Sequence, residues 1–141
     1  MRIAIILDHL DDLKPHKDTS LAIMREAEKR GHQLFVAMQG DVILRHEKVR
    51  ILAKSFAFSN GNAWYKLGEM MESAAADFDV VLMRKDPPFD NEFLYSTYLL
   101  DLAEKQGARV LNHPVSVRDW NEKLSIANFP QFAPEFLVTR E

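Results

Sequence analysis

The apolar residues of this chain fall into short unbroken runs separated by polar segments. Three of these runs are rich in β-branched or other large apolar residues: 2–8 (RIAIILD), 33–38 (QLFVAM) and 78–83 (FDVVLM). Continuous apolar runs of this length are typical of strands that are buried on both faces of a parallel sheet. Residues 109–112 (RVLN) form a shorter run, so we expect four strands, with the first of them central in the sheet.

Two further segments carry apolar residues at helical spacing. Residues 18–31 begin with helix-capping types, have apolar side chains at positions 21, 23, 24 and 27, and end in a basic turn and Gly31. Residues 90–106 have apolar side chains at positions 93, 94, 95, 98, 99 and 102 and stop before a glycine. Both patterns predict amphipathic helices with a glycine stop, and the second helix should bury Tyr95 and Tyr98.

The remaining segments have weaker patterns. Residues 41–58 alternate around a polar centre, as a β-hairpin or a pair of edge strands would. Residues 64–78 (WYKLGEMMESAAADF) and residues 121–129 (NEKLSIANF) each predict a short helix. Strands and helices therefore alternate along most of the chain, which predicts an α/β three-layer fold with a mainly parallel sheet.

Composition narrows the class of protein. The chain has 141 residues, about one domain on the usual size distribution. No apolar run approaches the roughly 20 residues that cross a bilayer, so we expect no membrane association. A formal net charge of −3 without a dense basic face disfavours nucleic acid as a partner. Cysteine is absent, which excludes disulfides and thiolate chemistry and leaves the reducing cytoplasm as the expected compartment.

Polar segments that follow strands are the places to look for a ligand site, because open α/β sheets bind ligands beyond the carboxyl ends of their strands. Three segments qualify, at residues 7–20, 84–92 and 112–124. The five glycines never approach the G-x-G-x-x-G spacing of a dinucleotide cradle.

The first of these segments is rich in carboxylates and imidazoles. Its polar residues offer oxygen and imidazole ligands to a metal ion: Asp8, His9, Asp11, Asp12 and His16. Solvation of a loop explains them better, so no metal site is predicted. A phospho-accepting role for Asp8, as in receiver modules, fits poorly, because no aspartate ends the second apolar run.

Longer stretches of the chain resemble one known family, the prokaryotic glutathione synthetases of the ATP-grasp superfamily. The resemblance is carried by residues 81–124 (VLMRKDPPFDNEFLYSTYLLDLAEKQGARVLNHPVSVRDWNEKL), 17–35 (KDTSLAIMREAEKRGHQLF) and 132–140 (FAPEFLVTR). It implies a Rossmann-like pre-ATP-grasp domain. Residues 1–141 would be a single N-terminal substrate-binding domain, and the ATP-grasp part would lie outside this chain.

The resemblance also implies an activity. Enzymes of this family join γ-glutamylcysteine to glycine with ATP and Mg²⁺ through an acyl phosphate, and they associate as homo-oligomers. A carboxylate becomes electrophilic only when a phosphoryl group supplies a leaving group, so lysines, arginines and Mg²⁺ provide positioning and charge stabilisation. We expect the segment 1–141 alone to be inactive. A stand-alone small-molecule-binding module or an oligomerisation module without ligase activity is the alternative.

Specific residues can be given roles on this basis. Arg84 can hold a substrate carboxylate with two hydrogen bonds, Lys85 adds a point charge, and Asp86 can accept from the γ-glutamyl ammonium. Pro87 and Pro88 stiffen this loop. The alternative is that Arg84 and Asp86 pair with each other or cap the helix that follows.

Two other groups complete the candidate site. Residues Lys17, Asp18, Thr19 and Ser20 are expected to cap the first helix, whose free N–H groups also suit a substrate carboxylate. By resemblance, Asn121, Glu122 and Lys123 belong to an NEKL motif, and Asn121 and Lys123 would contact ATP.

Overall fold

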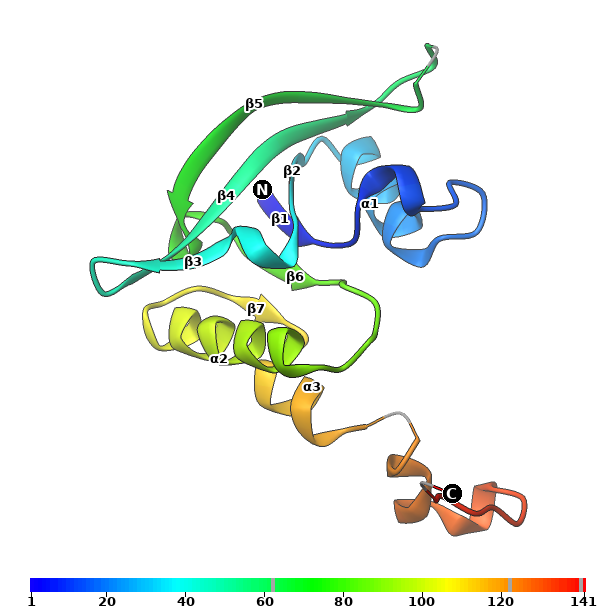
Figure 1. The fold of residues 1–141 in the computed structure, drawn as a ribbon. Coiled ribbons are helices and arrows are strands. Elements are labelled where there is room, and N and C mark those ends of the chain that lie inside the picture. The colour runs from blue at the N-terminus through cyan, green and yellow to red at the C-terminus, as the bar shows by residue number, and fades with distance from the viewer. Residues whose placement is uncertain (62, 122, 140) are drawn as a thin grey trace.

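The computed structural model describes residues 1–61, 63–121, 123–139 and 141. Its centre is a curled sheet in the order β3-β4-β2-β1-β6-β7, with β5 paired to β4 (Figure 1). The strands are β1 (Arg2–Ile6), β2 (Gln33–Ala37), β3 (Val42–Arg45), β4 (Lys48–Phe58), β5 (Tyr65–Ala74), β6 (Val80–Met83) and β7 (Val110–Leu111). The helices are α1 (Thr19–Lys29), α2 (Asn91–Lys105) and α3 (Pro114–Asp119).

The expected α/β fold is confirmed. The four apolar runs form β2, β1, β6 and β7, which pair in parallel. The strands β3, β4 and β5 extend this sheet through antiparallel pairing, and β4 joins them to β2. The segment 41–58 is the β3–β4 hairpin, as one of its two interpretations predicted. His46 and Glu47 have positive φ angles at its tip, as a tight hairpin turn requires.

The two faces of the sheet bury separate apolar clusters. Ile3 and Ile5 of β1 face Leu21 and Met24 of α1. The neighbouring positions, Ala4 and Ile6, point to the opposite cluster, because successive strand residues alternate between faces. The helix α2 contributes Phe93, Leu100 and Ala103 to that second cluster. The result is a three-layer arrangement with α1 on one face and α2 on the other.

The first two helices begin and end where the sequence indicates. The Asp18 carboxylate accepts a hydrogen bond from the backbone N–H of Leu21 at 2.9 Å, and Asp90 caps α2 through the N–H of Phe93 at 2.9 Å. Each cap satisfies a backbone donor that has no partner within its helix. Gly31 follows α1 with φ +77°, a left-handed conformation that glycine adopts without strain.

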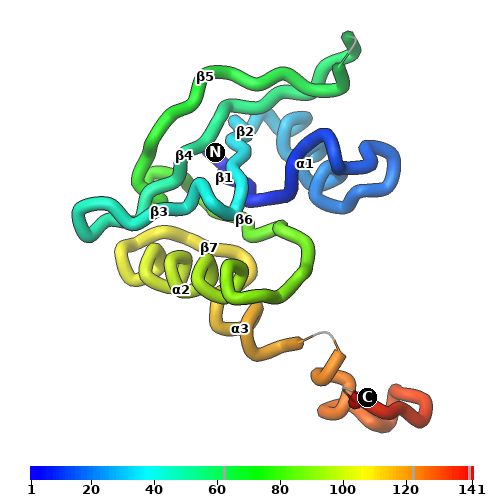
Figure 2. The backbone as a smooth tube through the Cα atoms, viewed as in Figure 1, coloured from blue at the N-terminus to red at the C-terminus, as the bar shows by residue number. Residues whose placement is uncertain are grey.

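Two helix predictions are wrong. Residues 65–74, expected to be helical, form the long edge strand β5. The helix expected at 121–129 is not formed by the described residues of that range, where Ser125–Asn128 make a short 3-10 turn, and the α-helix α3 lies before it. Figure 2 shows the chain leaving the domain after α3.

Two predicted core residues also lie elsewhere. Tyr95 and Tyr98 are 64% and 50% exposed, so they are not core residues. None of the helices in the described parts of the chain is long and apolar enough to cross a bilayer.

Candidate functional site

The loops that follow β1 and β6 lie together at one end of the sheet. These strands are neighbours and pair Ile6 with Met83. The next residue, Arg84, donates its backbone N–H to the Ile6 carbonyl at 2.7 Å. The loop after β6 therefore starts against the loop after β1, where parallel sheets of this kind bind ligands.

Asp8 joins the two loops. One of its carboxylate oxygens lies 2.7 Å from the Lys85 ammonium, and the other accepts the backbone N–H of Asp86 at 2.8 Å. Lys85 also donates to the Asp86 carbonyl oxygen at 2.6 Å. Both side chains of the ion pair are mostly buried, with 19% exposure for Lys85 and 28% for Asp8. The Lys85 ammonium is thus bound within the protein, where its contacts with Asp8 and the Asp86 carbonyl hold its loop in place.

Arg84 is positioned by the first helix. Its Nε donates to the Ser20 hydroxyl at 3.1 Å, and Ser20 is buried in the first turn of α1. A guanidinium carries five N–H donors in a fixed plane. The terminal Nη groups of Arg84 have no hydrogen-bond partner among the residues that the structure describes. They are the groups with which this site can bind a carboxylate.

The other residues expected near the first helix have different roles. Asp18 is the N-cap, so its carboxylate is engaged with the helix. Lys17 and Thr19 are exposed beside it, and Asp86 is exposed on the facing loop. Arg84 does not pair with Asp86; its side chain bonds Ser20, while Asp90 caps α2. The segment therefore presents positive and negative side chains around Arg84.

The residues of the expected NEKL motif lie beyond α3. The Asn121 side-chain oxygen accepts the backbone N–H groups of Lys123 at 2.9 Å and Leu124 at 3.1 Å. This closes a turn after the short helix. Lys123 is exposed, and Glu122 lies outside the described residues. The structure does not bring Asn121 and Lys123 to the Arg84 loop, since the chain has already left the sheet at this point (Figure 1).

Sequence reasoning missed the bridging role of Asp8. It considered Asp8 only as a metal ligand or a phospho-acceptor, whereas the side chain ties two loops together. The signal was its position directly after a central strand. Among the described residues, no three His, Cys, Asp or Glu side chains gather as a metal site would require.

Replacing Asp8 with alanine should destabilise this end of the sheet. The change removes an ion pair and a charge-assisted hydrogen bond from a mostly buried position, which costs about 2 kcal/mol of unfolding free energy. Urea unfolding of Asp8→Ala against the parent protein measures this loss. Asp12→Ala is the matched control, because Asp12 is exposed in the same loop and its loss should change stability by less than about 0.5 kcal/mol. Equal midpoints for both variants would contradict a bridging role.

A second contact fixes the loop after β1 from the opposite side. The Tyr65 hydroxyl, on β5, donates to the Asp11 carboxylate at 2.8 Å. This hydrogen bond, together with burial and the negative charge of Asp11, raises the pKa of Tyr65 above its ordinary value. The edge strand and the polar loop are thereby connected.

The raised pKa of Tyr65 predicts a loss of stability in alkali. The folded protein holds the phenol proton more tightly than the unfolded chain does. The stabilisation is therefore complete below the ordinary tyrosine pKa of about 10 and is lost as pH rises through the higher folded value. Tyrosinate absorbance of the parent minus that of Tyr65→Phe isolates this group from the other two tyrosines. Asp11→Asn should lower the Tyr65 pKa, and an unchanged titration would refute the assignment.

The chain is similar to known proteins of one family. Residues 1–118 match the family model described as "Prokaryotic glutathione synthetase, N-terminal domain". Glutathione synthetase of Nitrosomonas europaea is 48% identical over 145 residues, which cover 100% of this chain and 45% of that protein. Glutathione synthetases of Ralstonia nicotianae and Salmonella typhi are 44% and 42% identical, with 100% and 99% of this chain covered and 44% and 45% of theirs.

The chain thus spans less than half the length of these curated relatives. The family match covers all seven strands, both long helices and the Arg84 loop. This chain belongs to the family of prokaryotic glutathione synthetase N-terminal domains.

Proposed function

We propose that residues 1–141 form the substrate-binding N-terminal part of an enzyme that joins γ-glutamylcysteine to glycine with ATP, through an acyl phosphate. The observation that carries this proposal is the Arg84 guanidinium, which Ser20 orients and whose terminal donors are available at the carboxyl ends of β1 and β6. The names of the matched relatives support the same activity. The enzyme would be an ATP-dependent carbon–nitrogen ligase.

The substrate explains why the site mixes charges. γ-Glutamylcysteine carries an ammonium and two carboxylates at neutral pH, so a binding loop needs both signs. Arg84 would hold a carboxylate through its terminal N–H groups. The exposed carboxylate of Asp86 would accept from the ammonium, and Lys17 and Thr19 would lie at the rim beside the start of α1.

Three residues would mainly hold other groups of the site in place: Lys85, Asp18 and Ser20. Lys85 is held by Asp8 and by the Asp86 carbonyl, so it would keep Asp86 in place and add a positive field. Asp18 fixes the first turn of α1, and Ser20 fixes the plane of Arg84. A rigid loop loses little entropy on binding.

ATP and Mg²⁺ belong mainly to the part of the protein outside residues 1–141. ATP would supply the phosphoryl group that activates the substrate carboxylate. Within this chain the exposed Lys123 and the side-chain amide of Asn121 fit a phosphate contact, because they follow α3 at the surface. The Mg²⁺ ligands would likewise lie mainly outside residues 1–141.

The working protein would be a cytoplasmic homo-oligomer. A chain without cysteine needs no oxidising compartment. The protein would act on small molecules, and neither nucleic acid nor a membrane would be its partner.

The test compares the full-length gene product with the segment 1–141. The full-length protein should release ADP and form glutathione only when γ-glutamylcysteine and glycine are both present. The isolated segment should release no ADP but should bind γ-glutamylcysteine in calorimetry. ADP release by the segment would show that it is active alone. Binding without any turnover by the full-length protein would instead identify a binding module.

A further inference from the structure

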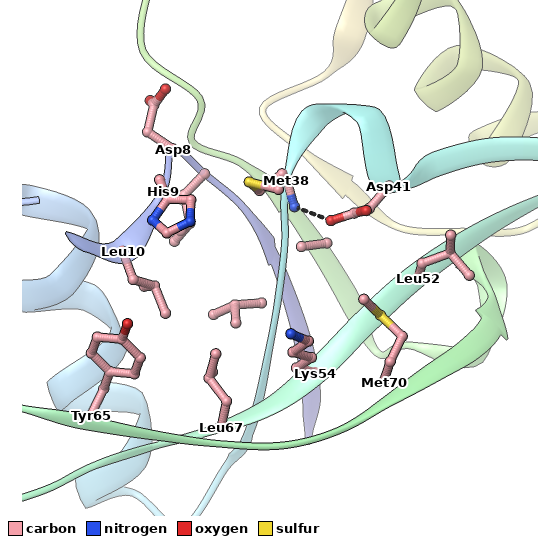
Figure 3. A pocket seen from close by; sticks show the side chains of 13 residues that line it. Asp8, His9, Leu10, Met38, Asp41, Leu52, Lys54, Tyr65, Leu67 and Met70 are labelled. Atoms are coloured by element: carbon pink, nitrogen blue, oxygen red, sulfur yellow. Dashed lines mark hydrogen bonds between the residues drawn. The ribbon is translucent and has the colours of Figure 1, made fainter. Parts of the chain in front are cut away.

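A cavity lies on the α1 face of the sheet, beside the long β4–β5 hairpin. Its volume is about 150 Å³. It is enclosed by the carboxyl ends of β1 and β2 on one side and by the middle of β4 and β5 on the other (Figure 3). Arg84, Lys85 and Ser20 do not line it. Asp8 lines this cavity and also binds Lys85 and Asp86 of the loop after β6.

An irregularity in the hairpin shapes this cavity. Lys54 pairs with Met70 and Phe56 pairs with Leu67, so β5 carries one more residue than β4 between these two pairs. Such a bulge lets residues three apart in sequence face the same side of a strand. It places Leu67 and Met70 together in the cavity wall (Figure 3). Both side chains keep substantial exposure, 39% and 52%, so the cavity is open to a ligand.

The cavity combines an apolar wall with one available cation. Most of the residues that line it are apolar. Lys54 is partly buried among them and has no hydrogen-bond or ion-pair partner within the part of the chain that the structure describes.

The two carboxylates at the edge of the cavity are already engaged. Asp41 accepts the Met38 backbone N–H at 2.8 Å, and Asp8 binds the Lys85 loop. Neither carboxylate forms an ion pair or hydrogen bond with Lys54 among the described residues, so its partly buried ammonium can still take an anion as a partner.

We propose that this cavity binds a small monocarboxylate with a compact apolar body, whose carboxylate meets Lys54. The apolar part would lie against Leu67, Met70 and Leu10. A cavity of about 150 Å³ holds a molecule the size of benzene, so the ligand class includes aromatic and branched aliphatic acids of that size. This site adjoins the proposed substrate site through Asp8, and its proposed ligand does not depend on the proposed activity.

Methionine methyl groups allow a direct test with benzoate as the probe. The chain has six methionines; Met38 and Met70 line the cavity, while Met24 and Met83 are buried in the two core clusters. With ¹³C-methyl methionine in the full chain, benzoate should shift the Met38 and Met70 signals saturably and leave Met24 and Met83 unchanged. Benzamide, its neutral isostere, should bind about tenfold more weakly, because it cannot form the ion pair.

Variants test whether the Lys54 ammonium causes the preference for benzoate over benzamide. Lys54→Met should reduce benzoate affinity to that of benzamide and leave benzamide binding unchanged, which also shows that the cavity is intact. Lys54→Arg should keep the preference for benzoate. Lys66→Met is the matched control on the neighbouring strand, because Lys66 is exposed and does not line the cavity.

Several outcomes would overturn the proposal. They are equal affinity of the parent protein for the two probes, shifts spread over all methionines, and no saturation at tens of millimolar. Competitive displacement of benzoate by γ-glutamylcysteine would place the cavity within the substrate site instead. Should Lys54→Met fail to fold, the comparison of benzoate with benzamide on the parent protein still decides.

Discussion

Replacing Arg84 with alanine in the full-length protein is expected to weaken γ-glutamylcysteine binding by about 100-fold. The guanidinium is partly buried and oriented by Ser20, so its two terminal Nη groups meet a carboxylate with little reorganisation. Truncating one partner of such a charge pair costs roughly 2–5 kcal/mol, and 100-fold is about 2.7 kcal/mol. Calorimetry with γ-glutamylcysteine measures the affinity, and steady-state kinetics should show the loss in kcat/KM.

Three variants separate this effect from a general loss of charge. Arg84→Lys keeps the charge but not the planar pair of donors, so it should recover only part of the affinity. Ser20→Ala removes the acceptor that orients Arg84 and should cost several-fold. Arg30→Ala is the control, because Arg30 is exposed and pairs only with Glu26, four residues away in α1. If Arg30→Ala weakens binding as much as Arg84→Ala, the site has been misplaced.

The sequence predicted the parts of this site that depend on strand order. The apolar runs before Asp8 and Arg84 marked two buried strands, and parallel neighbours carry their following loops to the same edge. The sequence did not predict which side chains pair with each other. Lys85 binds Asp8, which is 77 residues away in sequence, and nothing in local spacing distinguishes that pairing from a free lysine.

The misassigned strand has a specific cause. Leu67, Met70 and Met71 stand at i, i+3 and i+4, the spacing of an amphipathic helix. In the structure the bulge between β4 and β5 turns Leu67 and Met70 to one face, and Met71 packs against the opposite cluster. A strand with one inserted residue loses its period of two, so the pattern imitates a helix. Pairing with β4 makes this segment a strand, and the residues of the segment alone do not reveal that pairing.

The buried face of α2 was misjudged for a different reason. Its buried residues are Phe93, Ser96, Thr97, Leu100 and Ala103, and two of them are polar. Ser96 donates to the Glu92 carbonyl at 2.8 Å and Thr97 to the Leu94 carbonyl at 2.6 Å. These local bonds satisfy the hydroxyl donors, so burial costs little. When only apolar residues are counted, the predicted buried face of α2 is centred too close to Tyr95 and Tyr98.

This difference in the α2 face gives the largest expected effect on stability. Leu100→Ala should lower the unfolding free energy by about 3 kcal/mol, since Leu100 is 1% exposed and its loss leaves a cavity between α2 and the sheet. The melting temperature should fall by roughly 10 °C. Tyr95→Ala should change stability by less than about 0.5 kcal/mol, because Tyr95 is 64% exposed.

Calorimetric melting and urea unfolding of these two variants measure the contrast. Both replace a large side chain of the same helix with alanine. Helix propensity favours Tyr95→Ala over Leu100→Ala by only a few tenths of a kcal/mol, which is small beside the expected contrast. If Tyr95→Ala proves as costly as Leu100→Ala, α2 is rotated about its axis, and the face inferred from apolar spacing is the one that packs. If only Leu100→Ala unfolds early, the hydroxyl bonds of Ser96 and Thr97 have allowed this helix to bury a partly polar face.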